Sequence, residues 1–166
     1  DITKPGEISF KVGEVGPWHA PLSPDGNLIA PVNSDHHFAL YDLITGKQKL
    51  FLDSINAYAA AFSSNGNFVA AGNKNIQIYE TKTGNKILTG KGHTSGIYGM
   101  DYSNSLQLFA TSGDKTVRLW KVDDTAALKT LSNSSGVYAV KFTPDGKSLI
   151  AGCTNGIVHI FDVSSW

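Results

Sequence analysis

The chain has 166 residues, of which 41% are hydrophobic, and its 14 Lys and Arg residues balance 14 Asp and Glu residues. This length suits one domain with its own core, and the balanced charge gives no basic surface of the kind that draws proteins to nucleic acid or an anionic membrane. The single cysteine, Cys153, excludes an internal disulfide framework and a cysteine-based zinc cluster. Apolar runs such as Ala57–Phe62 are far too short to cross a bilayer. We expect no nucleic-acid or membrane partner, and an intracellular location, cytoplasmic or nuclear.

Along the chain, one short pattern recurs every 40 residues. Turn-forming tetrapeptides begin at Ser23, Ser63, Ser103 and Thr143. Five positions before each turn stands an aromatic residue: Trp18, Tyr58, Tyr98 and Tyr138. Each turn is followed by an apolar run and then by a second apolar segment that ends near an aromatic residue: Tyr41, Tyr79, Trp120 or Phe161. A fixed period of this length predicts four copies of one structural unit.

Each unit has the composition and periodicity of short β-strands. In the segment 115–120, KTVRLW, the apolar residues Val117 and Leu119 alternate with polar ones, so they share one face of a strand. Gly, Pro, Asn and Asp separate such segments, and no segment keeps a helical period over ten or more residues. The sequence therefore predicts an all-β repeat array.

A unit of about 40 residues with four short strands is typical of a propeller blade. The segment 90–122 resembles a WD40 repeat, because it carries the pair Gly92-His93, a turn aspartate at Asp114 and a strand-closing Trp120. The resemblance implies a WD40-type β-propeller with four blades of four antiparallel strands, as a partial ring or half of a larger ring.

The same resemblance implies the limits of the blades. Residues 1–13 are expected to form the outer strand of a preceding or closing blade. The four blades are expected at 14–53, 54–93, 94–133 and 134–166, the last without its outer strand. Three arrangements remain open: a segment of a longer propeller, a pair of copies that lend each other outer strands in an eight-bladed ring, or four blades that close alone.

Within the third unit, the resemblance implies a structural hydrogen-bond relay of His93, Thr111, Asp114 and Trp120. A buried indole N–H and imidazole need such partners, because an unpaired buried group costs about 1–3 kcal/mol. At the position of His93 the other units carry Gly13, Asp53 and Asn133. We therefore expect the other blades to be held by apolar packing alone.

The aromatic column that precedes the turns has two interpretations. In WD40 proteins this position lies at the rim of the channel, where an aromatic ring can anchor a partner. The alternative is packing between blades, since Tyr138 alternates in phase with Val140 and Phe142. Turn residues on the same face are expected to be exposed. The complete predicted partner-binding rim is Trp18, Tyr58, Tyr98, Tyr138, Asp35, Lys74, Asp114, Lys115 and Asn155.

These features predict a non-catalytic scaffold that binds proteins or peptides through its top-face loops, with no catalytic residue and no cofactor. We expect no metal, because neighbouring strand residues in Asp35–His37 point to opposite faces. One alternative is an enzyme or small-ligand binder, which would need carboxylates, or Ser, His and an acid, converging at the channel. Another is a structural segment of a longer seven- or eight-bladed propeller. An exposed apolar flank on the blade formed by Val137–Phe161 would indicate the latter.

Overall fold

The computed structural model describes residues 9–12, 16–33, 35 and 37–166. Their fourteen strands form four antiparallel sheets, which confirms the prediction of an all-β fold. No helix in the described part of the chain is long and apolar enough to cross a membrane. We call the sheets blades 1 to 4 in chain order.

Blades 2 and 3 each contain four strands in a meander. Blade 2 consists of β4 (Ala59–Phe62), β5 (Phe68–Gly72), β6 (Ile76–Glu80) and β7 (Lys86–Gly90). Blade 3 consists of β8 (Ile97–Ser103), β9 (Leu108–Gly113), β10 (Thr116–Trp120) and β11 (Lys129–Ser132).

Blades 1 and 4 each contain three strands. Blade 1 consists of β1 (Leu28–Ile29), β2 (Phe38–Asp42) and β3 (Gln48–Asp53), and blade 4 of β12 (Val137–Phe142), β13 (Ser148–Cys153) and β14 (Val158–Asp162). In blade 1 the position of the innermost strand is taken by a segment that forms only the isolated bridges His19↔Val32 and Leu22↔Ile29. Pro21 lies between these bridges and has no backbone N–H to donate, which limits the ladder there. The predicted strand limits 1–13 fall largely outside the described residues.

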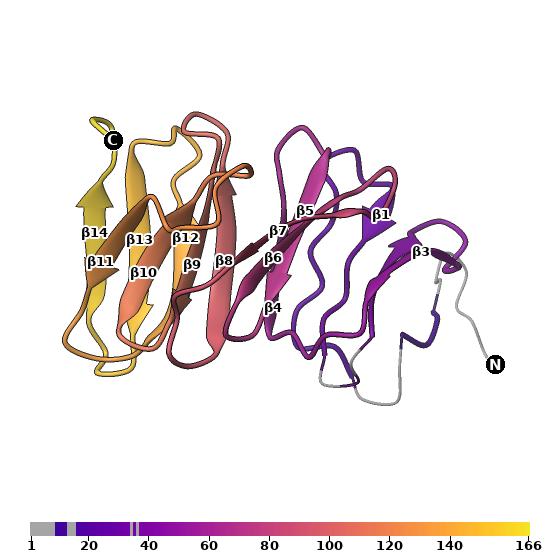
Figure 1. The fold of residues 1–166 in the computed structure, drawn as a ribbon, viewed down its shortest axis with the longest axis horizontal. Helices are drawn as coiled ribbons and strands as arrows, with labels where there is room; N and C mark the ends of the chain where they lie inside the picture. The colour runs from indigo at the N-terminus through magenta and orange to yellow at the C-terminus, as the bar shows by residue number, and fades with distance from the viewer. Residues whose placement is uncertain (1–8, 13–15, 34, 36) are drawn as a thin grey trace.

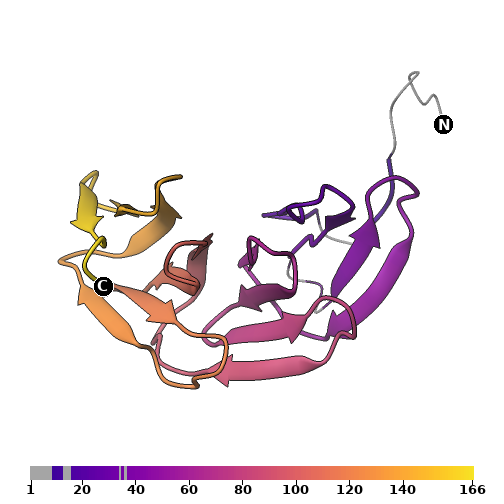
Figure 2. The same ribbon diagram turned by 90° about the horizontal axis from the view of Figure 1, so that it is seen from above.

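The four blades stand side by side along the chain (Figure 1). Viewed from above, they follow an open arc (Figure 2). The first strands of the blades line the concave side of this arc, and the outer strands β3, β7 and β11 lie on its convex side. Blades 1 and 4 form its two ends, so the described chain is a partial ring.

The core is divided into three clusters, each between two neighbouring blades. Blade 1 packs on blade 2 through a cluster that includes Ala30, Phe38, Leu40, Val69, Ala71 and Tyr79. Blade 2 packs on blade 3 through one that includes Ala70, Ile76, Ile78, Met100, Phe109 and Trp120. Blade 3 packs on blade 4 through one that includes Ala110, Val117, Leu119, Val140, Leu149 and Ala151. We call the face that a blade turns to the next blade its leading face, and the opposite one its trailing face.

The repeated turns have a common hydrogen-bond geometry. The Oγ of Ser63 accepts the backbone N–H of Phe68 at 3.0 Å, and Thr143 does the same for Ser148 at 3.0 Å. The glycine that ends these turns has a positive φ, 71° at Gly66 and 67° at Gly146, a conformation that side chains other than glycine rarely adopt. The turn of blade 1 has the same geometry, with Gly26 at a φ of 71° and the Leu28 N–H donating to Ser23 Oγ at 2.9 Å. Blade 3 differs, because its turn holds no glycine and the residue with a positive φ is Gln107.

Candidate interaction surface

The relay residues of blade 3 lie in one continuous chain of hydrogen bonds. Trp120 Nε1 donates to Thr111 Oγ1 at 2.8 Å, and Thr111 Oγ1 lies 2.8 Å from His93 Nε2. His93 Nδ1 lies 3.1 Å from Asp114 Oδ1. The Asp114 carboxylate can only accept, so Nδ1 carries a proton and donates to it. The Thr111 hydroxyl proton is not used by the indole and can be donated to Nε2. A neutral imidazole protonated on Nδ1 therefore satisfies every contact of the relay.

Asp114 is held by more partners than the sequence predicted. Its carboxylate accepts the backbone N–H of Thr94 at 2.9 Å and the Thr116 hydroxyl at 2.7 Å. Its own N–H donates to Ser95 Oγ at 2.8 Å. The signal for Thr116 was present in the sequence, since an aspartate two residues before a threonine commonly forms such a turn. This carboxylate belongs to the blade interior and is not available to a partner at the rim.

The electrostatic setting of the relay agrees with this proton arrangement. Burial lowers the pKa of the His93 imidazole, and the opposing effect of Asp114 is smaller. Burial also raises the pKa of the Asp114 carboxyl, but the hydrogen bonds from Thr94, Thr116 and His93 together outweigh it, so the net pKa lies below its usual range. At neutral pH the pair consists of a neutral imidazole and a carboxylate.

The relay predicts a pH dependence of stability. The pKa of His93 lies below 6.5 in the folded chain, so the unfolded chain takes up a proton first as the pH falls. The free energy of unfolding should therefore decline below about pH 6.5, and again below about pH 4 as the unfolded Asp114 carboxyl is protonated first. Thermal unfolding between pH 8 and pH 5 tests this, with His93→Asn as the variant. Burial also lowers the pKa of His19, so the stability of the His93→Asn variant should still decline somewhat as the pH falls. If the stability of this variant declined as steeply with falling pH as that of the native chain, the role of His93 would be contradicted.

Blade 2 has a polar link of its own, which corrects the expectation that apolar packing alone holds it. The Tyr79 hydroxyl lies 2.9 Å from Asp53 Oδ2, and Lys86 Nζ donates to the same oxygen at 2.7 Å. Tyr79 and Asp53 occupy the positions that Trp120 and His93 occupy in blade 3. Burial and the neighbouring Asp53 raise the pKa of the Tyr79 hydroxyl, so it stays protonated and donates. Alignment of the repeats showed that these positions correspond, but it did not predict the hydrogen bond between Tyr79 and Asp53, because the residue types differ from those of blade 3.

The aromatic column forms a ladder of four rings across the four blades. Trp18 stacks on Tyr58 with 4.8 Å between ring centroids, and Tyr58 stacks on Tyr98 at 5.6 Å. Tyr98 meets Tyr138 edge-on at 4.8 Å. The exposed fractions are 56% for Trp18, 43% for Tyr98 and 59% for Tyr138, while Tyr58 is half-buried. We call these four residues the aromatic ladder. Its rings pack on one another across the blades and remain open to solvent. Tyr138 does not share the buried side of Val140 and Phe142, because the register of β12 shifts between Val137 and Ala139. Binding of a partner by these rings stays a prediction.

A hollow of about 360 Å³ lies beside the ladder and is lined by Trp18, Tyr98 and Tyr138 together with His19, Met100 and Lys141, among others. The ionisable groups around it are paired within the protein. Lys141 Nζ lies 2.6 Å from Asp101 Oδ1, and His19 Nδ1 accepts the Ala60 backbone N–H at 3.4 Å. The wall is therefore aromatic and apolar, with its charges internally compensated.

The turns before the third strands lie at the same edge as the ladder. Strand register places the start of β4 beside the end of β5, and the start of β8 beside the end of β9, next to those turns. Lys74, Lys115 and Asn155 are exposed, whereas Asp35 is half-buried and its backbone N–H donates to Asn33 Oδ1 at 3.0 Å. The structure therefore brings the predicted rim residues to one edge, with the Asp114 carboxylate and Asp35 the least accessible.

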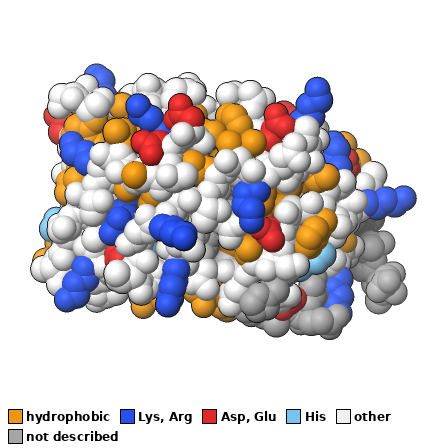
Figure 3. Space-filling model, in the orientation of Figure 1, with side chains coloured by type: hydrophobic (Ala, Val, Ile, Leu, Met, Phe, Trp, Pro, Cys, Tyr) orange, Lys and Arg blue, Asp and Glu red, His pale blue; other side chains and the backbone are white. Residues whose placement is uncertain are grey.

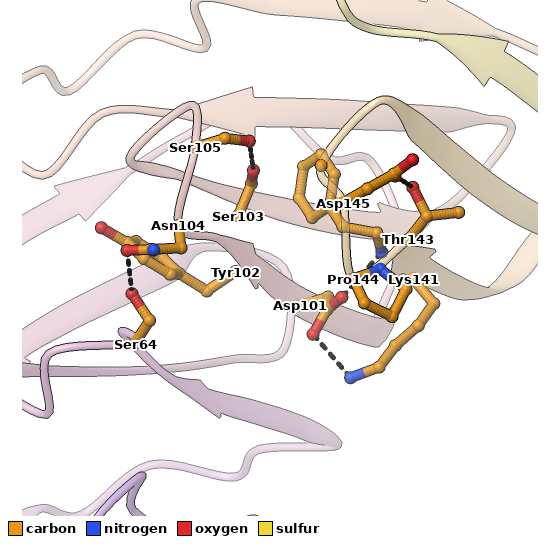
Figure 4. A pocket seen from close by; sticks show the side chains of 12 residues that line it. Ser64, Asp101, Tyr102, Ser103, Asn104, Ser105, Lys141, Thr143, Pro144 and Asp145 are labelled. Atoms are coloured by element: carbon orange, nitrogen blue, oxygen red, sulfur yellow. Dashed lines mark hydrogen bonds and ion pairs between the residues drawn. The ribbon is translucent and has the colours of Figure 1, made fainter.

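A larger hollow of about 500 Å³ lies at the opposite ends of the same strands, between blades 3 and 4 (Figure 4). Figure 4 shows Asp101 and Lys141 pointing toward each other, and Ser64 beside Asn104 of the next blade. Asp101 Oδ2 also accepts the Phe142 backbone N–H at 2.7 Å, and Ser64 Oγ donates to Asn104 Oδ1 at 2.7 Å. The polar groups that line this hollow thus form hydrogen bonds and an ion pair between neighbouring blades. The sequence analysis missed these pairs, although their separation of 40 residues was a usable signal.

The described residues contain no group of three or more His, Cys, Asp or Glu side chains that could hold a metal ion. His37 Nε2 instead lies 2.8 Å from Gln48 Oε1, and its ring packs against Phe51. On the face shown in Figure 3, Lys and Arg side chains are dispersed, with Asp and Glu among them.

Comparison with known proteins identifies the repeats. The family pattern described as WD domain, G-beta repeat matches residues 84–121 and 126–162. The chain belongs to the WD40-repeat family. Both matches fall in the half of the chain that carries the complete relay, and the structure extends the same architecture to blades 1 and 2. The resemblance seen in the sequence is therefore confirmed.

Several curated proteins are similar to this WD40 chain over part of their length. A WD repeat-containing protein of Synechocystis is 29% identical over 79% of the chain and 39% of its own length. The eukaryotic translation initiation factor 3 subunit I of Candida albicans is 34% identical over 58% of the chain and 28% of its own length. The serine-threonine kinase receptor-associated protein of Gallus gallus is 26% identical over 80% of the chain and 39% of its own length. The match thus spans well under half of each relative.

Proposed function

We propose that this WD40 chain is a non-catalytic scaffold that binds proteins or peptides along its aromatic ladder and the adjoining turns. The observation that carries the proposal is the ladder itself, in which three rings are each more than 40% exposed while stacking holds them in place. Large rigid rings with a polar tip lose little conformational entropy on binding, so they serve well as anchors. Two relatives also support the proposal, since one is a subunit of an initiation factor and the other is a receptor-associated protein.

The hollow beside the ladder supports a binding role over a catalytic one. Asp101 and Lys141 neutralise each other, and His19 accepts a backbone N–H, so these groups already have partners within the protein. A general acid or base needs a free group aimed at the substrate. We therefore expect the bound segment to be extended and low in charge, with apolar side chains against the rings.

A selection from a random peptide library displayed on phage tests this function. We expect peptides enriched on the native chain to bind the double variant Tyr98→Ala, Tyr138→Ala at least tenfold more weakly, because anchor residues of this type contribute about 2 kcal/mol or more. Ile87→Ala is the matched control, since Ile87 is 47% exposed on the outer strand β7, away from the ladder. Enriched peptides that bind the double variant as tightly as the native chain would overturn the proposal.

A further inference from the structure

A hollow of about 630 Å³ opens where the leading face of blade 1 meets the trailing face of blade 2, at the edge opposite the aromatic ladder. The first turn of each blade forms part of its wall, with residues 23–25 in blade 1 and residues 64–67 in blade 2. Lys49 on β3 and Lys82, which follows β6, also line it. The hollow is therefore built by the junction between two blades of this chain.

Packing between the two blades brings together the backbone segments that carry the two lysines. A Cβ at Gly84 would lie 2.9 Å from Leu50 Cδ2, so the turn after β6 rests on β3 next to Lys49. The Thr81 hydroxyl donates to the Gly66 carbonyl and ties this turn to the first turn of the same blade. The fold thus places both lysines at one hollow.

The hollow offers hydrogen-bond donors that have no partner within the protein. Lys49 and Lys82 are exposed, and neither forms an ion pair with a described residue. Asn65 Oδ1 accepts the Ser63 hydroxyl at 2.8 Å and the Asn67 backbone N–H at 3.0 Å, which leaves Asn65 Nδ2 available. The side-chain amide of Asn67 forms no hydrogen bond within the part of the chain that the structure describes. Two cations and two amide groups are therefore open to a ligand.

Asp25, the carboxylate that lines this hollow, already has partners. Its Oδ1 accepts the Ser23 hydroxyl at 2.5 Å, and its Oδ2 accepts Asn27 Nδ2 at 2.8 Å. In the hollow between blades 3 and 4, by contrast, the lining lysine Lys141 is paired with Asp101. The hollow between blades 1 and 2 therefore has an excess of unpaired positive charge and favours an anionic ligand.

We propose that this hollow binds a phosphoryl group carried on a serine or threonine side chain of a partner protein. A phosphoserine carries about −1.5 to −2 charges and three strong acceptor oxygens, which matches two ammonium groups and two amide donors. A carboxylate carries a single charge and leaves part of these donors unused. The hollow also falls in the range of about 300–1,000 Å³ that is typical of ligand sites, so it has room for residues beside the phosphoryl group. This inference does not rest on the proposed peptide binding, which uses the opposite edge of the blades.

Nuclear magnetic resonance of the full 166-residue chain tests the site. The probes are a capped tripeptide with phosphoserine between two glycines, the same tripeptide with serine or glutamate at its centre, and inorganic phosphate. We expect the phosphorylated tripeptide to shift the side-chain amide resonances of Asn65 and Asn67 until they saturate. It should bind about tenfold or more tightly than the glutamate and serine tripeptides, because it forms more charge-assisted hydrogen bonds. Inorganic phosphate should bind about threefold or more weakly than the phosphorylated tripeptide, since it leaves the rest of the hollow empty.

Two double variants of equal charge separate a built site from general attraction between opposite charges. Lys49→Ala combined with Lys82→Ala should weaken binding of the phosphorylated tripeptide about tenfold or more. Lys91→Ala combined with Lys121→Ala is the matched control, because both lysines are exposed and lie outside the hollow. This control should keep its affinity within about twofold. All four side chains are exposed, so we expect both variants to fold, and circular dichroism checks that they keep their strands.

Four results would overturn the inference. Unchanged resonances of Asn65 and Asn67 would show that the hollow is not the site. Equally tight binding of the glutamate or serine tripeptide would show that the phosphoryl group is not what is recognised. Equally tight binding of inorganic phosphate would assign the hollow to a free anion, and equal weakening by the two double variants would leave only an unspecific attraction between charges.

Discussion

Trp120→Ala is expected to lower the free energy of unfolding by about 3–5 kcal/mol. The indole is fully buried in the cluster between blades 2 and 3, so its removal leaves a cavity there. An alanine would also leave Thr111 without its indole donor and weaken the hold on His93. The loss combines a cavity with a broken relay, so both contributions act in the same direction.

Urea denaturation of the native chain and two further variants separates these contributions. Trp120→Phe keeps most of the apolar volume and removes the N–H, so we expect a loss of about 1–3 kcal/mol. Trp18→Ala is the control, because Trp18 is 56% exposed and stacks on a single ring, Tyr58; we expect a loss of no more than about 1.5 kcal/mol. Equal losses for Trp120→Ala and Trp18→Ala would show that the relay and its cluster do not stabilise the fold.

Gly113→Ala is expected to destabilise the chain by about 1–3 kcal/mol, although it adds one methyl group in a strand. A Cβ at Gly113 would lie 2.3 Å from the Gly96 carbonyl oxygen and 3.3 Å from His93 Nδ1. The first of these atoms belongs to the backbone, so relief requires the chain near the relay to shift. Without that shift, an alanine cannot be accommodated at the end of β9.

Gly152→Ala is the matched control for this substitution. Gly152 also lies on the second strand of its blade, and its Cβ would meet only Ala139 Cβ, at an ordinary contact distance of 3.6 Å. We expect a change within about 0.5 kcal/mol in the mid-point analysis of chemical denaturation. If both alanine variants were equally stable, the close packing at Gly113 would not be a constraint on the fold.

The sequence contained enough to predict the repeat but not every contact between repeats. The 40-residue period located the strands, because turn chemistry and alternation act locally, and the resemblance to a WD40 repeat implied the four relay residues. It could not show that Asp53 would accept from Tyr79, since that bond depends on how an outer strand approaches the next blade. The sequence also left open whether the Tyr98 ring is exposed or buried. Alternation shows on which side of a strand a residue lies, but not whether a neighbouring blade covers that side. The repeat pattern also did not show that the innermost segment of blade 1 forms only isolated bridges, where Pro21 has no backbone N–H to donate.

The division of the core into clusters that each join two blades has a consequence for how the molecule tolerates change. The stability of such a repeat array is approximately the sum of the contacts between adjacent blades, so a weak contact between two blades has little effect on blades further along the array. One fully bonded unit can therefore coexist with others whose bonding is reduced, such as the Tyr79–Asp53 pair. The array can diverge unit by unit while its outline is preserved.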